Sequence, residues 1–161
     1  VFMTGKGKSA KEIKESLEKA AYDASIYIAV DTLEYLKKGG RITAAAAALG
    51  SVFQVKPILT IQGDKLDAFA KVRGMKKCRH RMAEALQEDL DTRFREIDRH
   101  RLIVATAGAG LTEEEAVAWK NEIAEAFPGM EVYYNPLSFS ISTHVGPGAI
   151  GAGICVKNRE D

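Results

Sequence analysis

Short β-type segments alternate with amphipathic helical segments along most of this chain, and this alternation constrains the fold more than any other feature. Runs of β-branched and apolar residues predict strands at 26–30, 102–106, 131–137 and 149–156. Apolar residues at helical spacing predict long helices at 75–94 and 112–127. Strands connected through helices in this rhythm form layered structures with neighbouring strands partly parallel. We therefore expect an α/β sandwich with a mixed, partly parallel sheet.

Two capping boxes predict where helices begin. Ser9 and Glu12 have the required spacing, as do Thr112 and Glu115. After Ser9, alanine, isoleucine and leucine recur at helical intervals as far as Ala24. Further along, 32–38 predicts a short helix that ends at two glycines, and the alanine-rich stretch 43–53 predicts another on propensity alone.

An antiparallel hairpin is expected within this alternation. Strand-like segments at 57–62 and 65–72 flank Gln62-Gly63-Asp64, which suits a tight turn. The structure of the stretch 138–143 stays open. No internal repeat and no linker rich in proline or serine appears, so we expect residues 1–161 to form one α/β domain.

Composition excludes several classes of protein. The chain is 46% hydrophobic and 28% charged, as soluble globular proteins are. Its 23 basic and 22 acidic side chains leave a net charge of +1, which argues against general nucleic-acid binding. No apolar run reaches about 18 residues, so no bilayer span is expected. Two distant cysteines, Cys78 and Cys155, do not suggest a disulfide framework, which favours a reducing, cytoplasmic location.

The first residues carry no apolar leader, so we expect no signal peptide. The sequence begins at Val1 rather than at a methionine and opens almost at once into a helix cap. We therefore expect it to be part of a longer protein.

Several motifs lack the context that their chemistry requires. Gly7-Lys8-Ser9 resembles the end of a phosphate-binding loop, but no strand precedes it and Phe2 occupies the position of the first glycine. The stretch 146–151 matches G-x-G-x-x-G, but a strand rather than a helix is expected to follow it. The histidines are far apart, and no local pattern predicts a metal site or a catalytic nucleophile.

A basic run, Lys71–Arg81, contains no acidic residue. One interpretation is a solvated helix face, balanced by the acidic residues that follow in the same helix. The alternative is a patch that faces an anion or a partner protein. Arg73 stands out in that second interpretation because it precedes Gly74 at the junction of a strand and a helix.

Two further segments favour an anionic ligand. Gly39-Gly40-Arg41 precedes the alanine-rich helix, where free backbone N–H groups and the helix dipole attract anions; the alternative is a simple cap and turn. Near the end of the chain, His144 precedes Gly146-Pro147-Gly148, where we expect a rigid turn. A histidine can bind a carboxylate, with Thr143 beside it as a hydrogen-bonding group, although a lone histidine is more often structural.

Together these segments resemble the DegV family in order and spacing. The matching segments are Leu33–Leu36, Gly39–Ile42, Lys56–Leu59, Lys71–Gly74 and Thr143–Ala149. Their order and spacing hold across about four-fifths of the chain. The sequence is therefore similar to the C-terminal α/β domain of that family, with an N-terminal domain not contained in it.

The resemblance implies a fatty-acid carrier rather than an enzyme acting alone, with a long-chain fatty acid as ligand and no cofactor. The acyl chain would lie in an apolar tunnel, where each buried methylene contributes about 0.8 kcal/mol. The carboxylate would lie near His144 and Thr143 and near hydroxyl groups of the N-terminal domain. A separate fatty acid kinase would phosphorylate it for phospholipid synthesis, docking on the face of Arg41 and Arg73.

Apolar side chains near these motifs are candidates for the tunnel, although each could equally be an ordinary core residue. They are Ile42, Leu49, Val52, Phe53, Ile58, Leu59 and Ile61. The sequence departs from some fatty-acid carriers at Ala44, where those proteins have a second arginine. The alternatives to a lipid carrier are a protein-docking module that uses the basic run Lys71–Arg81 and a small nucleotide- or phosphate-processing enzyme.

Overall fold

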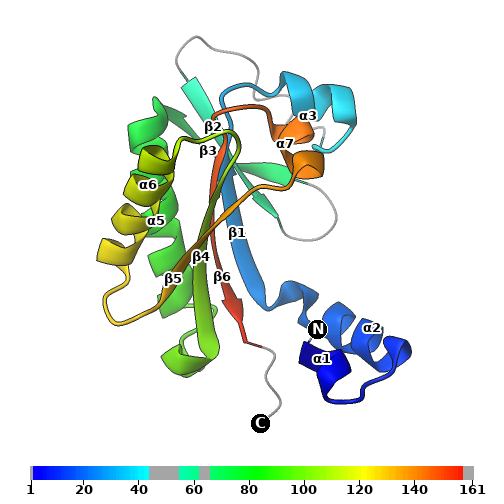
Figure 1. Cartoon of the computed structure of the whole chain (residues 1–161). Helices are drawn as coiled ribbons and strands as arrows, with labels where there is room; N and C mark the ends of the chain where they lie inside the picture. Colours follow the sequence, from blue (N-terminus) through cyan, green and yellow to red (C-terminus); the bar gives the residue numbers. More distant parts are fainter. Residues whose placement is uncertain (1, 44–54, 62–65, 158–161) are drawn as a thin grey trace.

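A computed structural model describes residues 2–43, 55–61 and 66–157 of the chain. Within them, six strands form one sheet in the order β3-β2-β1-β6-β4-β5 (Figure 1). The strands are β1 (Ala24–Ala29), β2 (Val55–Ile61), β3 (Leu66–Arg73), β4 (Leu102–Gly108), β5 (Val132–Pro136) and β6 (Ile150–Val156). Strands β4 and β5 are parallel, and the other neighbouring pairs are antiparallel. The predicted mixed, partly parallel sheet is confirmed.

Helices lie on both sides of this sheet. They are α1 (Phe2–Gly5), α2 (Ala10–Lys19), α3 (Glu34–Gly39), α5 (Met75–Asp91), α6 (Glu113–Ala126) and α7 (Phe139–Val145), with single 3₁₀ turns η1 (Ala20–Tyr22) and η2 (Arg99–Arg101). Helices α5 and α6 cover one face, whereas the short helices α3 and α7 lie together at one end of the other face (Figure 1). The fold is therefore the expected layered α/β sandwich.

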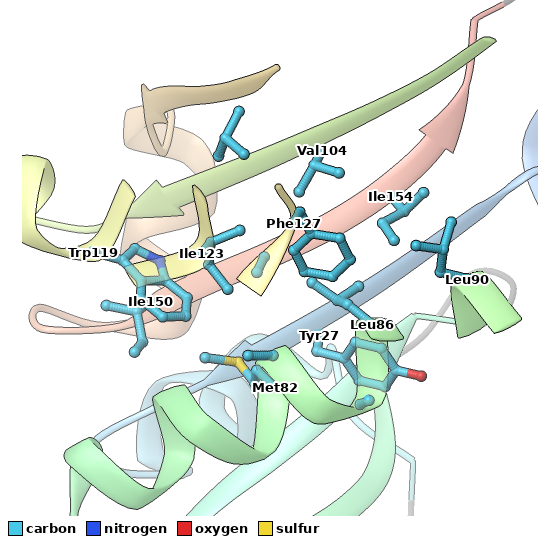
Figure 2. Packing of buried hydrophobic residues seen from close by; sticks show 14 of the residues in the cluster. Tyr27, Met82, Leu86, Leu90, Val104, Trp119, Ile123, Phe127, Ile150 and Ile154 are labelled. Carbon is cyan, nitrogen blue, oxygen red and sulfur yellow. The ribbon is translucent and has the colours of Figure 1, made fainter. Parts of the chain in front are cut away.

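The larger core lies under α5 and α6. The predicted apolar stripe of α5 is buried at Cys78, Met82, Leu86 and Leu90. It meets Trp119 and other side chains of α6 over the inward face of the central strands (Figure 2). The Trp119 indole Nε1 donates a hydrogen bond to the Gly151 carbonyl oxygen at 3.0 Å, so the polar atom of this buried ring is satisfied.

A second, smaller core lies on the opposite face, beneath α3 and α7. Its buried members are Ile28, Val30, Leu33, Leu36, Leu59, Ala109, Val145 and Ala149. Along β1 the side chains alternate between the two cores, since Tyr27 belongs to the first and Ile28 to the second. The second core therefore anchors both short helices to the same end of the sheet.

Both predicted capping boxes are present, although the first helix is shorter than expected. Ser9 caps α2 and Thr112 caps α6, each with the reciprocal glutamate contact. Helix α2 ends at Lys19, and Ala24 is the first residue of β1 rather than part of the helix. Ala24 pairs with Cys155 of β6, so strand pairing with a distant segment overrides the local helical spacing.

The segment before the last strand also differs from the prediction. Residues 139–145 form helix α7, so His144 lies in a helical turn and not on the rigid turn expected from the sequence. The helix begins after Ser138, whose carbonyl accepts the Ser142 N–H at 2.9 Å. The hairpin of β2 and β3 is confirmed, whereas its turn and almost all of the predicted alanine-rich helix lie outside the described residues.

Candidate ligand-binding site

The packing of α3 against α7 brings together the two glycine-containing segments that the sequence singles out. A Cβ atom placed on Gly39 would lie 2.4 Å from Nδ1 of His144, far inside the closest approach of real atoms. The imidazole therefore lies directly against the backbone of α3. Position 39 must be free of a side chain for this contact to exist.

A second contact of the same kind joins the two helices. A Cβ atom on Gly146 would lie 2.5 Å from Cδ2 of the Tyr35 ring. Gly146 also has a φ of 81°, in the region that favours glycine. The aromatic ring of α3 thus covers the backbone that ends α7, and the two contacts together fix the relative position of the helices.

Arg41 and His144 share a pocket of about 330 Å³ beside these contacts. Its lining residues are Leu36, Arg41, Leu66, Ser140, Ile141, His144 and Val145. The Arg41 guanidinium donates from Nη1 to the Gly39 carbonyl oxygen at 2.8 Å, which holds the side chain beside α3. Four aliphatic side chains combined with a guanidinium and an imidazole suit a ligand that has an anionic end and an apolar body.

Thr143 opens into a different pocket from His144. That pocket, of about 530 Å³, is lined by Tyr35, Phe139, Ser142 and Thr143, among others. Successive residues of an α-helix point about 100° apart, which separates neighbours on α7. The Thr143 hydroxyl donates to the Ser140 carbonyl oxygen at 2.9 Å and so also supports the helix. The two residues that the sequence pairs therefore face different spaces.

The sheet divides the apolar candidates for the tunnel. Leu59 is fully buried in the core beneath α3 and α7, and the half-buried Ile42 packs against the same core. Ile58 is fully buried in the other core, under α5. Ile61 is half-buried at the end of β2, and Phe53 lies outside the described residues together with Leu49 and Val52. Among the candidates that the structure describes, Leu59 and Ile42 share a core with the wall of the Arg41–His144 pocket.

Arg73 lies far from Arg41. It is the exposed last residue of β3, followed by Gly74 with a φ of 80° at the start of α5, as the sequence predicts. Arg41 bonds through its backbone to Leu66 at the other end of the same strand. Because a strand rises about 3.3 Å per residue, the two backbones are roughly 23 Å apart. A partner contacting both arginines would span the length of β3.

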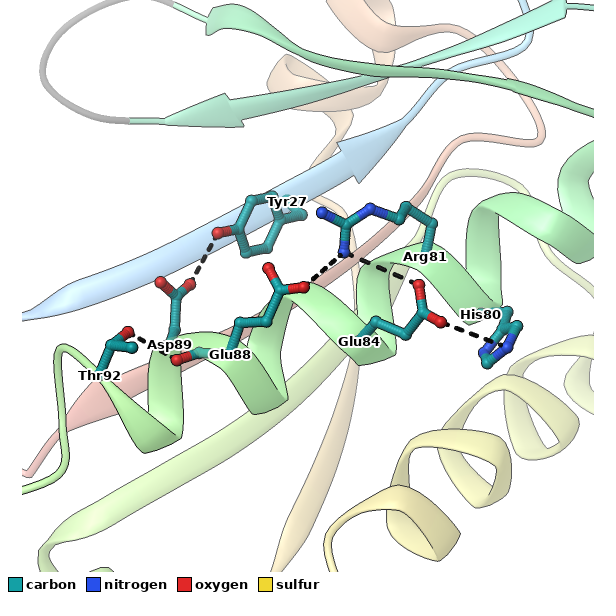
Figure 3. Close-up of polar contacts among 7 residues, drawn as sticks. All are labelled: Tyr27, His80, Arg81, Glu84, Glu88, Asp89 and Thr92. Atoms are coloured by element: carbon teal, nitrogen blue, oxygen red, sulfur yellow. Dashed lines mark hydrogen bonds and ion pairs between the residues drawn. The ribbon is translucent and has the colours of Figure 1, made fainter.

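Three of the seven basic and histidine side chains of the basic run lie in ion-pair contact with glutamates of α5 and α6. Arg79 lies 3.7 Å from Glu122, and Arg81 lies 3.8 Å from Glu84 and 3.5 Å from Glu88. His80 lies 3.5 Å from Glu84 (Figure 3). Lys71, Arg73, Lys76 and Lys77 are exposed. The solvated-face interpretation therefore describes the helical part of the run, and the exposed cations gather at its start.

Other kinds of site find little support in the described part of the chain. No group of three or more histidine, cysteine, aspartate or glutamate side chains there could hold a metal ion. Both cysteines are unpaired, and burial raises the pKa of the Cys78 thiol to about 11, which disfavours the nucleophilic thiolate. Among the described helices, none has the length and apolarity needed to cross a membrane.

Sequence reasoning missed the remaining lining residues of the Arg41–His144 pocket, which are Leu36, Leu66, Ser140, Ile141 and Val145. Nothing in the local sequence distinguishes them from ordinary core or surface positions. The usable signal was indirect: Gly39 and Gly146 are glycines within motifs, which can mark places where two parts of the chain approach closely.

Comparison with known proteins identifies the family. The family model described as "Uncharacterised protein, DegV family" matches residues 2–157. The chain belongs to the DegV family. Among its DegV relatives, Protein DegV of Bacillus subtilis (strain 168) is 34% identical over 153 residues, covering 92% of this chain and 50% of that protein. A fatty acid-binding protein of Thermotoga maritima is 30% identical over 152 residues, covering 93% and 49%.

Solved DegV structures share the fold. A DegV family protein from Thermus thermophilus, whose structure concerns fatty acid binding, superposes with a TM-score of 0.75 at 30% identity, covering 96% of this chain and 53% of that one. DegV of Bacillus subtilis, a fatty acid binding protein, superposes with a TM-score of 0.72 at 32% identity, covering 96% of this chain and 52% of that one. The chain thus spans about half the length of these relatives, and the known fatty-acid binding belongs to proteins about twice as long.

Proposed function

We propose that this DegV chain is the C-terminal domain of a fatty-acid carrier. The observation that carries the proposal is the pocket that Arg41 and His144 line together with aliphatic side chains. A carboxylate accepts a hydrogen bond from an imidazole, a guanidinium in the same pocket suits an anionic group presented to a partner, and aliphatic walls suit an acyl chain. Relatives and solved structures named as fatty acid binding support the same ligand class.

In this proposal His144 binds the carboxylate and the acyl chain continues over the smaller core, near Leu59 and Ile42. Thr143 would join the site only through water or through groups outside this chain, since it lines a different pocket. The remaining part of the carboxylate site comes from an N-terminal domain that precedes residues 1–161. The ligand itself is a long-chain fatty acid.

The carrier presents the carboxylate to a separate fatty acid kinase, which forms acyl phosphate for phospholipid synthesis. Arg41 is exposed and lines the same pocket as His144, a position suited to meeting the kinase where the carboxylate emerges. The chain itself then performs no reaction. A cytoplasmic location stays a prediction from the two unpaired cysteines.

Lipid extraction tests the binding step. The full-length protein is purified and denatured, its lipids are extracted, and the extract is analysed by mass spectrometry. We expect close to one long-chain fatty acid per protein, together with uptake of added palmitate. Absence of acyl chains combined with no uptake would refute the proposed function.

Substitution of His144 and Arg41 separates retention of the lipid from its presentation to the kinase. We expect His144→Ala to weaken palmitate binding about tenfold, the effect of losing roughly 1.4 kcal/mol of carboxylate interaction. Arg41→Ala should retain palmitate but slow phosphorylation by the kinase. The matched control is Lys38→Ala, an exposed cation of α3 three residues before Arg41, which should affect neither palmitate binding nor phosphorylation. If Arg41→Ala instead releases the lipid, the guanidinium belongs to the carboxylate site.

Neighbouring residues on opposite faces of β2 test the path of the acyl chain. Leu59→Val and Ile58→Val each remove little volume and should each cost about 0.5–1.5 kcal/mol of stability. Only Leu59→Val should change the distribution of bound acyl chain lengths, because Ile58 lies beneath α5. An equal change from both substitutions would contradict a path over the smaller core.

The protein-docking alternative makes a different prediction. If the basic run Lys71–Arg81 formed the functional surface, partner binding would weaken with salt and survive removal of lipid. Binding measured at two ionic strengths, with lipid-free and lipid-loaded protein, distinguishes this alternative from the carrier.

A further inference from the structure

Gly39 contacts both the imidazole and the guanidinium of the Arg41–His144 pocket. Its Cα atom faces the imidazole, since a Cβ added there would lie 2.4 Å from Nδ1, 3.0 Å from Cε1 and 3.5 Å from Cγ of His144. Its carbonyl oxygen accepts a hydrogen bond from Nη1 of Arg41 at 2.8 Å. One residue without a side chain thus determines where the imidazole and the guanidinium lie.

The backbone of α3 does not itself require glycine at this position. Gly39 is the last residue of the helix, and the left-handed conformation that ends the helix belongs to the following residue, Gly40, with a φ of 62°. Within a helix, glycine is less stable than alanine by roughly 0.5–1 kcal/mol. Folding of α3 alone would therefore favour alanine at position 39, and the contact with His144 is what opposes it.

The ring orientation follows from the same contact. Nδ1 lies on the edge of the imidazole that faces Gly39, and Nε2 is not among the three ring atoms closest to that position. With its Nδ1 edge held by the backbone of α3, the ring presents its other nitrogen away from the helix. His144 itself lines the pocket with Arg41.

We propose that Gly39 is a positioning residue. Because it has no side chain, the His144 imidazole lies in the position that binds the carboxylate, and the Gly39 carbonyl oxygen holds the Arg41 guanidinium in place. The inference rests on the proposed function for its ligand, but its structural part concerns only α3 and α7. Gly39 touches no ligand in this scheme and acts through the two side chains. Any side chain at position 39 would displace the ring.

Gly39→Ala provides the test, because it adds one methyl group and keeps the carbonyl that binds Arg41. We expect palmitate to bind about tenfold more weakly to the full protein, the change produced by roughly 1.4 kcal/mol. The melting temperature should stay the same or rise, since alanine favours the helix. Unchanged palmitate affinity would overturn the proposal, as would an affinity loss that appears only with unfolding.

Gly40→Ala is the matched control. A Cβ at Gly40 meets nothing within 4 Å, but its positive φ strains any other residue. This variant should lower the melting temperature and leave palmitate affinity within about twofold, a pattern opposite to that of Gly39→Ala. In a His144→Ala background, Gly39→Ala should have no further effect on binding. An additive loss in that double variant would show that Gly39 acts independently of the imidazole.

Imidazole NMR signals give a readout that does not depend on lipid. The sequence has three histidines, and His80 and His100 are exposed and lie on other elements. We expect Gly39→Ala to shift the ring signals of His144 while those of His80 and His100 stay in place. Unchanged His144 signals would refute the positioning role. If the wild-type protein binds no fatty acid but these signals move, the proposed function fails and the structural role of Gly39 stands.

Discussion

At the scale of single residues, this fold depends on glycines whose lack of a side chain leaves room for an aromatic ring. Gly146 receives Tyr35 and Gly39 receives His144. The two glycines differ in why they are needed, since Gly146 has a φ of 81° and a ψ of 168°, a combination that is essentially restricted to glycine. Gly146 therefore satisfies a backbone requirement and a packing requirement together.

Alanine at Gly146 should destabilise the protein more than alanine at Gly148. Both positions have a positive φ, but a Cβ at Gly148 meets nothing within 4 Å, whereas at Gly146 it would meet the Tyr35 ring. We expect Gly148→Ala to cost roughly 1–2 kcal/mol from backbone strain alone and Gly146→Ala to cost more. Urea unfolding measures both, and equal costs would mean that the ring moves away freely.

At the scale of elements, two capping boxes of the same kind begin helices with very different surroundings. Helix α6 buries Ala116, Trp119 and Ile123, whereas α2 has no buried residue. In α6, the Glu115 N–H donates to Thr112 Oγ1 at 3.2 Å, and the Thr112 N–H donates to the Glu115 carboxylate at 2.9 Å. The same local signal thus begins one helix that belongs to the core and one that does not.

Removal of each cap should therefore affect global stability differently. Thr112→Ala should lower the free energy of unfolding by about 1 kcal/mol, because unfolding of α6 exposes the core. Ser9→Ala should fray α2, seen as faster amide exchange in residues 10–19, with a much smaller change in the global value. Equal losses from both variants would show that α2 is coupled to the sheet.

At the scale of the whole molecule, the sheet separates the larger core, under α5 and α6, from the smaller core beneath the candidate site. The larger core contains a buried polar pair in which the Tyr27 hydroxyl donates to the Asp89 carboxylate at 2.7 Å (Figure 3). Burial and this carboxylate raise the pKa of Tyr27, and burial raises the pKa of Cys78 to about 11. Both groups favour their protonated forms in the folded state.

Stability should consequently fall in alkaline solution. A raised pKa in the folded state contributes stability that is present below the ordinary value, 9.0 for Cys78 and 10.0 for Tyr27, and is lost as pH rises above it. We expect the free energy of unfolding to decline from about pH 9 upward, by at most about 1.4 kcal/mol per pH unit for each group. Cys78→Ala should flatten the decline between pH 9 and 11, and an unchanged slope would contradict the assignment.

Local sequence determined those elements whose signal lies within a few neighbouring residues. The capping boxes, the apolar stripe of α5 and the β2–β3 hairpin follow from spacing that is encoded within a few residues of each site. The period of a strand also implies that Ile58 and Leu59 face opposite sides. Local chemistry indicated Arg41 and His144 as groups that could meet an anion, and family resemblance added the order of the motifs and a fatty acid as the ligand.

Tertiary structure decided which of those candidates meet. His144 lies against Gly39, 105 positions earlier in the chain, because α3 and α7 pack on the same small core. Thr143, although adjacent to His144, faces another pocket since a helix replaces the expected turn. Ala24 joined a strand for a similar reason, through pairing with Cys155. Such contacts form between segments far apart in the chain, and no local pattern carries the information about which distant segment returns to which helix.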